Sequence, residues 1–376
     1  MGQFDFEQVK NPEYFQENRR RAHSDHSFYK TLEGAKREDN DFKYLLNGMW
    51  KFSYAVKPAL SVKGFERLDY DCRDWADIKV PAHIQMEGYD VPQYANTQYP
   101  WEGRDEVRPG EIPMNFNPVA SYVKYFFVPE ELKGQKVYIS FQGVESNLIL
   151  WCNGEFVGYS EDSFTPHEFE LTPYLKEGEN KLAAQVYKWS AGSWLEDQDF
   201  FRFSGIFRDV YLFTVPKVHI WDVKIETVLS DSFEEGCLKL NLVCEGEGSI
   251  EASLYDGEEM AAEASLLVHE GAAAGELLIS QPQLWSAEAP KLYQLYLTVK
   301  NAAGSVEEVV KQNVGFRRFE IRDSIMYING KRIIFKGVNR HEFDSRQGRV
   351  PNMENLWLDL TTMKRNNINA IRTSIE

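Results

Sequence analysis

The chain has few cysteines and no spaced set of metal ligands. It contains four cysteines in 376 residues, and no two of them form a CxxC pair: Cys72, Cys152, Cys237 and Cys244. The seven histidines include no HExxH or similar pattern. These absences exclude the familiar zinc and dithiol motifs. A reducing compartment is the simpler interpretation, with a Cys237–Cys244 bridge as the alternative.

Long apolar runs and excess positive charge are also absent. No run approaches the roughly 20 apolar residues that span a bilayer. The N-terminus, MGQFDFEQVKNPEYF, has neither a basic nor an apolar region of the kind found in signal peptides. Lys and Arg total 42 against 58 Asp and Glu, a net charge of −16 that repels nucleic acids and anionic membranes. We therefore predict a cytoplasmic protein with neither a nucleic acid nor a membrane as partner.

The composition is that of an ordered protein with more than one domain. Hydrophobic residues make up 43% and aromatic residues 14%, and 376 residues allow two or three domains with their own cores. Residues 1–45 form a polar N-terminal arm with the basic run Arg19-Arg20-Arg21. Its position favours a solvated, flexible terminus. Its aromatic residues instead favour an arm that lies against another surface: Phe4, Phe6, Tyr14, Phe15, Phe28 and Tyr29.

Residues 46–215 consist of short β-rich segments without a long helix between them. The clearest strands are residues 49–54, 121–126, 137–141, 147–151, 155–159, 181–187 and 209–213. Asn153-Gly154 between two of them is the strongest short hairpin signal in the chain. This pattern predicts an antiparallel β-sandwich of the jelly-roll type.

Residues 216–320 predict a second all-β unit. Strands are expected at residues 218–228, 238–244, 250–255, 292–299 and 306–314, with turns at 255–257 and 301–304. About 100 residues of this kind suit an immunoglobulin-like sandwich. The Ala- and Glu-rich segment 258–275 is compatible with a helix, and we interpret it as a strand pair.

Residues 321–376 predict the beginning of a different architecture. A hairpin around Asn329-Gly330 leads into the apolar run 333–335, which is followed by the polar cluster 339–342. A helix that Asn352 can cap comes next, with Met353, Trp357, Leu360 and Met363 on one face, and then the apolar segment 369–371. Strand, helix and strand in this order imply parallel pairing, as in a (β/α)8 barrel, which needs about 250 residues. We expect a mainly β chain that ends in a truncated barrel of one βαβ portion.

Several motifs together carry a resemblance to a known family. They are Asn11-Pro12, LNGMW at 46–50, VP at 80–81, QMEGYD at 85–90, YANTQYP at 94–100, LWCNG at 150–154, SWLEDQD at 193–199, SGIFRDV at 204–210, LWSAE at 284–288 and GVNRHE at 337–342. With them the chain resembles the N-terminal part of a bacterial β-galactosidase of the large, multi-domain glycoside hydrolase family 2 type. Their number, order and spacing argue against chance agreement.

The resemblance implies a sugar-binding role for the first sandwich and four substrate-binding residues. Asn96 would hydrogen-bond a galactosyl hydroxyl, and Asp199 would accept hydrogen bonds from the sugar and help to hold a sodium ion. His341 would contact the galactose ring, and Arg372 would lie beside the catalytic carboxylates. The implied reaction is retaining hydrolysis of terminal β-galactosides such as lactose by two glutamates about 5 to 5.5 Å apart.

The same resemblance implies that no catalytic residue lies in this chain. The two glutamates and the ligands of the implied Mg²⁺ belong to later barrel strands, so we expect the chain to be inactive alone. Its expected partners are a β-galactoside, the remainder of the barrel and further copies in a homo-oligomer. The family continues Arg372-Thr373-Ser374 with a histidine of the sugar site, whereas this chain ends in Ile375-Glu376. We do not interpret Glu376 as catalytic.

Each site residue also has a simpler interpretation. Asp199 is compatible with a solvated carboxylate, Asn96 with a turn former, and Arg372 with a buried ion pair. His341 is compatible with a structural histidine bonded to Glu342 or Asp344.

Other interpretations concern the aromatic residues and the function of the whole chain. Trp189 and Trp194 could stack on a sugar, but such residues are more often core, and neither is predicted as a site. A non-catalytic carbohydrate-binding protein and an oligomer-assembly module are the alternative functions, and β-glucuronides remain an open specificity.

Overall fold

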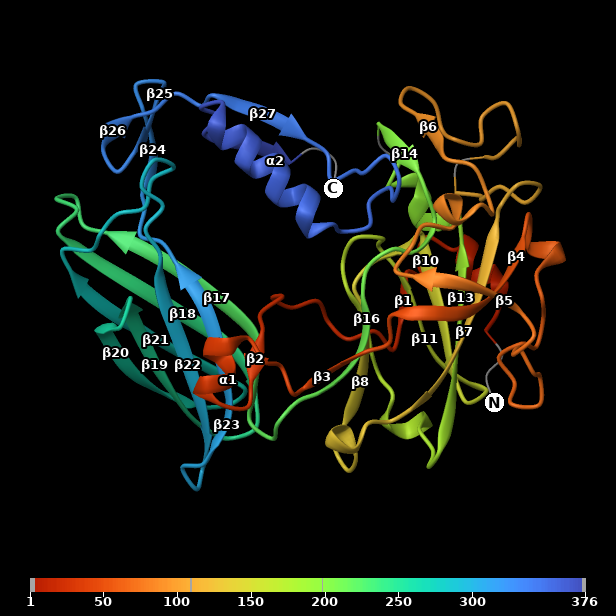
Figure 1. The fold of residues 1–376 in the computed structure, drawn as a ribbon, viewed down its shortest axis with the longest axis horizontal. Coiled ribbons are helices and arrows are strands. Elements are labelled where there is room, and N and C mark those ends of the chain that lie inside the picture. The colour runs from red at the N-terminus through yellow and green to blue at the C-terminus, as the bar shows by residue number, and fades with distance from the viewer. Residues whose placement is uncertain (1–3, 109, 198, 374–376) are drawn as a thin grey trace.

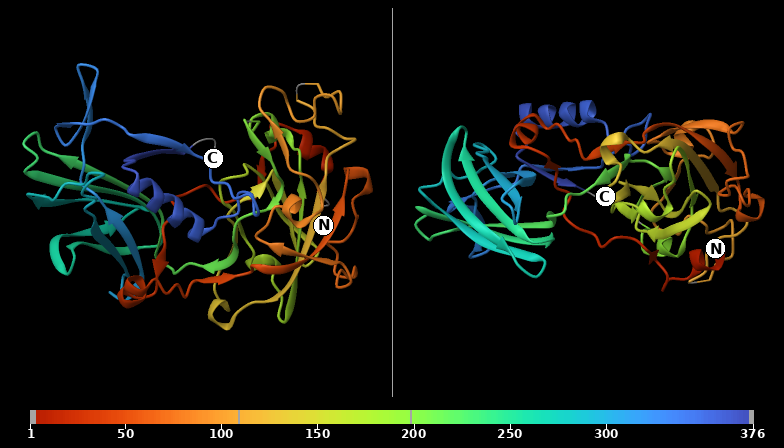
Figure 2. Two further views of the ribbon diagram at one scale, coloured as in Figure 1. Left: turned by 45° about the horizontal axis from the view of Figure 1, so that its top comes forward. Right: turned by 90° about the horizontal axis from the view of Figure 1, so that it is seen from below.

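The computed structural model describes residues 4–108, 110–197 and 199–373. Two β-sandwiches lie side by side along the longest axis of the molecule, and a βαβ segment lies beside the junction between them (Figures 1 and 2). This confirms the mainly β fold class. Ser374, Ile375 and Glu376 lie outside the described residues, so the expectation about Glu376 is not addressed by the structure.

The first sandwich is built from a seven-stranded and a four-stranded sheet. The larger sheet has the order β1 (Gln16–Glu17), β11 (Glu155–Glu161), β10 (Asn147–Cys152), β13 (Glu179–Tyr187), β7 (Val119–Phe127), β4 (Gly48–Ala55) and β5 (Ala76–Val80). The smaller sheet has the order β12 (His167–Glu170), β8 (Val137–Phe141), β16 (Val210–Thr214) and β3 (Lys43–Leu45). Two further antiparallel pairs lie at its edge, β6 (Gln93–Ala95) with β14 (Phe200–Arg202) and β9 (Val144–Glu145) with β15 (Gly205–Ile206).

Alternating side chains explain how these sheets pack. In β4, Trp50 and Phe52 are 1% and 2% exposed and face the core between the sheets. The Trp50 ring lies 6.4 Å from that of Phe141 in the opposite sheet. The hairpin between β10 and β11 turns at Asn153 and Gly154, whose φ angles of 52° and 87° are the positive values that a type I′ turn requires. The predicted strands of this unit are confirmed.

The connections of the first sandwich contain short 3-10 helices. They are η1 (Phe6–Lys10), η2 (Pro58–Leu60), η3 (Ile84–Glu87), η4 (Glu130–Leu132), η5 (Thr172–Tyr174) and η6 (Ala191–Trp194). The last of them leads directly into the loop that carries Asp199.

The N-terminal arm packs on both sandwiches. β1 pairs with β11 of the first sandwich, and β2 (Phe28–Tyr29) pairs with β23 (Val306–Val314) of the second. The Phe4 ring stacks on Tyr159 at 5.1 Å, and the Arg20 guanidinium lies 3.5 Å from the centre of the Trp221 ring. The arm also contains the helix α1 (Leu32–Arg37). The expectation of an arm that lies against another surface is confirmed for the described residues.

The second sandwich pairs a three-stranded with a five-stranded sheet. Their orders are β17 (His219–Leu229), β18 (Glu235–Glu245), β21 (Ala272–Ser280), and β2, β23 (Val306–Val314), β22 (Tyr293–Asn301), β19 (Gly248–Asp256), β20 (Glu259–Val268). The Ala- and Glu-rich segment forms two strands, as interpreted, but they join opposite sheets: β20 pairs with β19 and β21 with β18.

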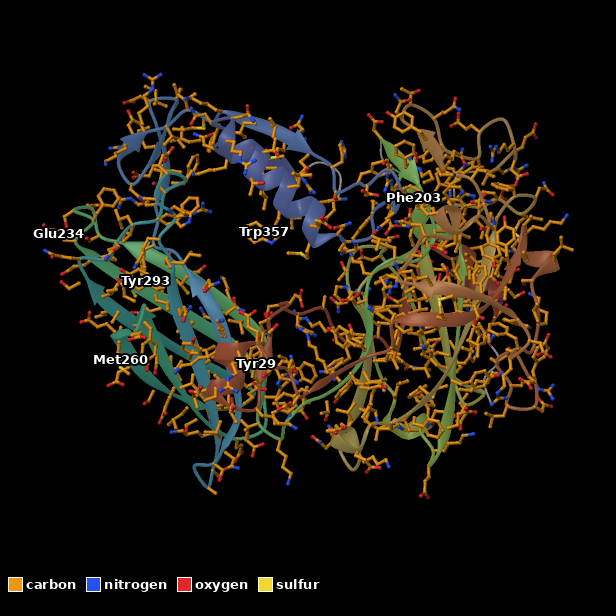
Figure 3. All side chains as sticks on the ribbon, in the orientation of Figure 1. Tyr29, Phe203, Glu234, Met260, Tyr293 and Trp357 are labelled. Carbon is orange, nitrogen blue, oxygen red and sulfur yellow. The ribbon has the colours of Figure 1, made fainter. Side chains whose placement is uncertain are left out.

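The last segment contains a three-stranded sheet and the βαβ unit. The sheet consists of β24 (Phe319–Arg322), β25 (Ile325–Ile328) and β26 (Lys331–Arg332), and β27 (Gly337–Arg340) then pairs in parallel with β28 (Ala370–Thr373) across α2 (Met353–Arg365). The Asn352 side chain accepts a hydrogen bond from the Asn355 amide, so the predicted helix cap is confirmed. Trp357 projects from the face of α2 that is turned away from β27 and is 62% exposed (Figure 3).

The position of the first parallel strand differs from the prediction. We expected it at residues 333–335, and the structure has it at Gly337–Arg340, where it overlaps the polar cluster 339–342. Ile334 and Phe335 are 63% and 48% exposed, so the apolar character of this run does not mark the position of the strand. The strand lies instead where its residues pair with the parallel strand β28.

The structure also tests the alternative disulfide bridge and the presence of membrane-spanning helices. All four cysteines are free, and Cys237 and Cys244 lie on the same strand, which excludes the alternative bridge. Within the described ranges, no helix combines the length and the apolar character needed to cross a bilayer.

Candidate functional site

Asn96 and Asp199 lie at the same end of the small sheet formed by β6 and β14. Phe200 pairs with Ala95 and Arg202 with Gln93, so Asn96 follows one strand where Asp199 precedes the other. The Tyr94 hydroxyl donates a hydrogen bond to Asp199 Oδ1. This bond, together with desolvation and the carboxylate charge, raises the pKa of Tyr94. The structure therefore brings two of the four predicted site residues together.

Both of these side chains are exposed and able to meet a ligand. The Asn96 amide oxygen accepts a hydrogen bond of 2.7 Å from the Thr97 backbone, so Asn96 has the predicted role of turn former. Its NH₂ group is a double donor of the kind that binds a sugar hydroxyl oxygen. The Asp199 carboxylate can accept hydrogen bonds from hydroxyl groups.

His341 and Arg372 lie on the two parallel strands of the βαβ unit. His341 is the first residue after β27, and Arg372 is in β28, opposite Asn339. Both are exposed. β27 runs toward the first sandwich, so its carboxyl end faces the side where β6 and β14 lie (Figure 1). Residues at the carboxyl ends of such strands line the active sites of (β/α) barrels.

The loop that follows His341 packs on β14. Phe343 stacks on Phe201 with ring centres 5.0 Å apart and an angle of 10°, and the Phe201 ring lies 5.6 Å from that of Tyr94. The Tyr94 hydroxyl in turn binds Asp199. A continuous set of contacts thus joins Asp199, which lies at the same end of β6 and β14 as Asn96, to the loop that begins with His341.

A buried ion pair strengthens this contact. The Arg349 guanidinium pairs with the Glu145 carboxylate, and both side chains are nearly inaccessible to solvent. Arg349 also donates a hydrogen bond of 3.0 Å to the Phe201 carbonyl oxygen. Gly348 next to it has φ +68°, and a Cβ there would lie 2.7 Å from His83 Cδ2.

His83 completes the surface on which the loop rests. Its ring is fully buried between Phe203 at 4.4 Å and Phe207 at 5.0 Å, and Phe203 lies at the edge of the first sandwich nearest to this loop (Figure 3). Burial, with a smaller effect of the Arg349 charge, lowers the pKa of His83 well below its ordinary value. A neutral imidazole lets the guanidinium lie close by without repulsion.

Buried charged groups lie behind the site. Lys188 pairs with Asp90 at 2.5 Å, and Arg202 of β14 pairs with Asp197. Glu196 accepts hydrogen bonds of 2.7 Å from both the amide and the hydroxyl of Ser163, yet burial raises its pKa to about 7. A cavity of about 20 Å³ among these groups has the size of one water molecule.

Sequence reasoning missed the residues that assemble the site. Tyr94 was recognised only as part of a motif, and Phe201, Phe343, Arg349 and Glu145 were not singled out. One usable signal was present, because Tyr94 stands two positions before Asn96 and alternation places both on one side of a strand. The contacts made by Arg349 join residues about 200 positions apart, which no local pattern reveals.

The residues present fit a sodium ion only in part. The Asp199 carboxylate and the Tyr94 phenol offer two hard oxygen donors of the kind that hard cations prefer. Among residues 4–108, 110–197 and 199–373, no group of three or more His, Cys, Asp or Glu side chains could hold a metal ion.

Comparison with protein families gives three consecutive matches. Residues 43–216 match the model described as glycosyl hydrolases family 2, sugar binding domain. Residues 218–317 match glycosyl hydrolases family 2, and residues 319–375 match glycosyl hydrolases family 2, TIM barrel domain.

Curated relatives and solved structures agree with these matches. The chain is 52% identical to a β-galactosidase of Halalkalibacterium halodurans and 51% identical to one of Clostridium acetobutylicum, in each case over 97% of this chain. It spans only 37% and 41% of the length of these relatives. The fold is similar to that of a β-glucuronidase from Ruminococcus gnavus (TM-score 0.70, 20% identity, 89% of this chain and 56% of that one). It is also similar to that of a β-glycosidase from Bacteroides vulgatus (TM-score 0.70, 26% identity, 88% and 41%).

Proposed function

The chain belongs to glycosyl hydrolase family 2, and from this we propose that it forms the substrate-recognition part of a retaining β-galactosidase. Its substrates would be terminal β-galactosides such as lactose. The observation that carries the proposal is the set of contacts from Asp199 through Tyr94, Phe201 and Phe343 to the loop of His341.

Each site residue has a defined role in this proposal. The Asn96 amide and the Asp199 carboxylate bind galactosyl hydroxyl groups from the sandwich side. His341 contacts the ring from the end of β27, and the Arg372 guanidinium lies beside the catalytic carboxylates. Because the sugar is held from two sides, its orientation is fixed before the reaction, and positioning of this kind can account for a large part of a rate enhancement.

The reacting groups lie outside these 376 residues in our proposal. Two glutamates about 5 to 5.5 Å apart would act as acid/base and nucleophile. The Mg²⁺ ligands would lie with them, and Asp199 would contribute to a sodium site completed by residues outside this chain. The whole enzyme would be a cytoplasmic homo-oligomer, and the remainder of the barrel would cover the exposed side chains of α2.

The test is hydrolysis of a chromogenic β-galactoside by this chain, alone and mixed with a polypeptide that carries the rest of the barrel. We expect activity only in the mixture, no cleavage of the matching β-glucuronide, and a loss of at least about 100-fold with Asp199→Asn. Asp231→Asn on the second sandwich, where the carboxylate pairs with Arg318, is the matched control. Turnover by the chain alone, or an unchanged rate with Asp199→Asn, would contradict the proposal.

A further inference from the structure

An open hollow with aromatic walls lies beside the loops that carry Asn96 and Asp199. We call it the aromatic hollow and define it by the aromatic and charged residues that line it, Tyr99, Trp101, Glu102, Asp105, Glu106, Arg108 and Trp194. Its volume is about 510 Å³, within the range of about 300 to 1,000 Å³ that is usual for small-molecule sites. Neither Asn96 nor Asp199 lines it.

The walls of the aromatic hollow are preformed. Tyr99 stacks on Trp101 with ring centres 5.1 Å apart and an angle of 10°. The Trp194 ring lies 4.5 Å from Tyr99 and 4.9 Å from Trp101. Trp101 is buried, whereas Tyr99 and Trp194 are half-buried, so each of them keeps part of its ring accessible.

Hydrogen bonds hold both sides of the aromatic hollow in place. The Trp194 indole N–H donates to the Glu111 carbonyl oxygen at 2.6 Å, and the Tyr99 amide donates to Glu102 at 3.1 Å. Asp105 accepts hydrogen bonds from the Asn115 backbone at 3.0 Å and from its side chain at 2.7 Å. A rigid aromatic wall binds a ligand without first losing conformational entropy.

The rim of the aromatic hollow is polar and carries both signs of charge. The Glu102 and Glu106 side chains are exposed acceptors, the half-buried Asp105 carboxylate is held by Asn115, and the exposed Arg108 guanidinium is a donor. An anion would meet three carboxylates, and an organic cation would meet the guanidinium. A purely apolar ligand would remove water from these charged groups. It would offer no hydrogen bonds in place of those that the groups make with water.

We propose that the aromatic hollow binds a pyranose ring of a neutral saccharide. A sugar ring has an apolar face of C–H groups, which packs on aromatic rings, and hydroxyl groups around its edge, which bind carboxylate and guanidinium groups. The choice of a sugar rests partly on the proposed function. Tyr99 comes three residues after Asn96, and Trp194 comes five before Asp199, so the same two loops carry both sites.

The proposal revises the prediction made for Trp194. Its residue type predicted a core position, as is usual for tryptophan in a β-sandwich. The half-buried ring of Trp194 instead forms a wall of the aromatic hollow, whereas Trp189 is 4% exposed and is core, as predicted.

The test is saturation-transfer NMR and affinity measurement with the full chain, using methyl β-D-glucoside and methyl β-D-galactoside. We expect the glucoside to bind with a dissociation constant on the order of 1 mM, with the strongest transfer to its axial ring protons. Trp194→Leu should weaken this binding at least about 10-fold, and Glu106→Gln roughly 3-fold. Glu106 is exposed, so its variant tests the proposal even if Trp194→Leu fails to fold.

Two controls separate this site from the galactosyl site. Trp357→Leu removes an exposed tryptophan on α2 and should leave glucoside binding unchanged. Asp199→Asn should leave glucoside binding unchanged and weaken galactoside binding, which reports on the proposed function independently.

Three results would overturn the proposal. The first is glucoside binding that survives both Trp194→Leu and Glu106→Gln, and the second is no detectable glucoside binding by the unchanged chain. The third is binding of benzyltrimethylammonium, an aromatic-cage ligand, at the same residues in place of the sugars.

Discussion

Arg349 and Glu145 form a buried ion pair between the βαβ unit and the first sandwich. Their side chains are 7% and 9% exposed, and they lie about 200 residues apart in the sequence. The Arg349 guanidinium also stacks over the rings of Phe164 and Phe203, each 5.3 Å away. This pair fixes the loop that carries His341 against β9, and the Arg349 hydrogen bond to the Phe201 carbonyl oxygen fixes it against β14, the strand that follows Asp199.

Removal of one partner should destabilise the chain strongly. Arg349→Met leaves the Glu145 carboxylate buried and uncompensated, which should lower the free energy of unfolding by about 3 kcal/mol. The double variant Arg349→Met with Glu145→Gln should lose less than the sum of the two single changes, because no charge is then left unpaired. Urea denaturation of the three variants measures both effects.

The matched control is the ion pair between Arg340 and Asp359 within the βαβ unit. Its distance is 2.9 Å, but the Asp359 side chain is 44% exposed, so Asp359→Asn should cost less than about 1 kcal/mol. Equal costs for the two pairs would show that Arg349 makes an ordinary surface contact.

Local chemistry accounts for the parts of the fold that the sequence predicted well. Asn153-Gly154 specifies its turn because both residues accept positive φ, and Asn352 specifies a helix start because its side chain replaces a missing backbone partner. The strand at 337–340 was misplaced because its position depends on β28, about 30 residues later. The apolar run 333–335 that attracted the prediction is largely exposed.

The sequence predicts individual residues of the candidate site but not their arrangement. Matching the sequence to family motifs is enough to select Asn96, Asp199, His341 and Arg372, because such a match depends only on sequence positions. It does not show that the Tyr94 hydroxyl binds Asp199 or that Phe343 stacks on Phe201. The first contact joins two segments of the first sandwich 105 residues apart, and the second depends on how the βαβ unit packs on that sandwich.

The loss of stability in Gly348→Ala, compared with that in Gly304→Ala, should separate the cost of backbone strain from the cost of a clash with His83. Gly348 has φ +68° and its added Cβ would lie 2.7 Å from His83 Cδ2, whereas Gly304 has φ +80° with nothing within 4 Å. Gly304→Ala should therefore cost about 1 kcal/mol from conformation alone, and Gly348→Ala roughly 1 to 3 kcal/mol more. Thermal unfolding of the two variants compares them, and equal losses would mean that the loop does not rest on His83.

Glu161 should make the stability of the chain fall as pH rises. Burial raises the pKa of Glu161 from 4.5 to about 7, despite hydrogen bonds from the Tyr159 hydroxyl and the Gly192 amide. The folded state therefore binds the proton more tightly than the unfolded state. The stabilisation is complete below pH 4.5 and is lost as pH rises through about 7.

Glu161→Gln should remove this dependence. The variant imitates the protonated side chain, so its free energy of unfolding at pH 8 should exceed that of the unchanged chain by on the order of 2 kcal/mol, with little difference at pH 4. Urea midpoints at the two pH values measure the change, and Glu234→Gln at an exposed position is the control. A variant that is less stable at pH 8 would mean that Glu161 is held as a carboxylate.

Tyr94→Phe should weaken sugar binding without unfolding the protein. The substitution removes the O–H that donates to Asp199 Oδ1 and retains the ring that contacts Phe201 at 5.6 Å. Tyr94 is 55% exposed, so the unfolding temperature should change little. Without this donor the Asp199 carboxylate is no longer held in one orientation, and the affinity for methyl β-D-galactoside should fall roughly 5- to 10-fold.

Tyr44→Phe, at a 46% exposed position on β3, is the matched control. An unchanged affinity in Tyr94→Phe would mean that Asp199 is oriented by other groups or does not bind the sugar, and the affinity of Asp199→Asn decides between these two explanations.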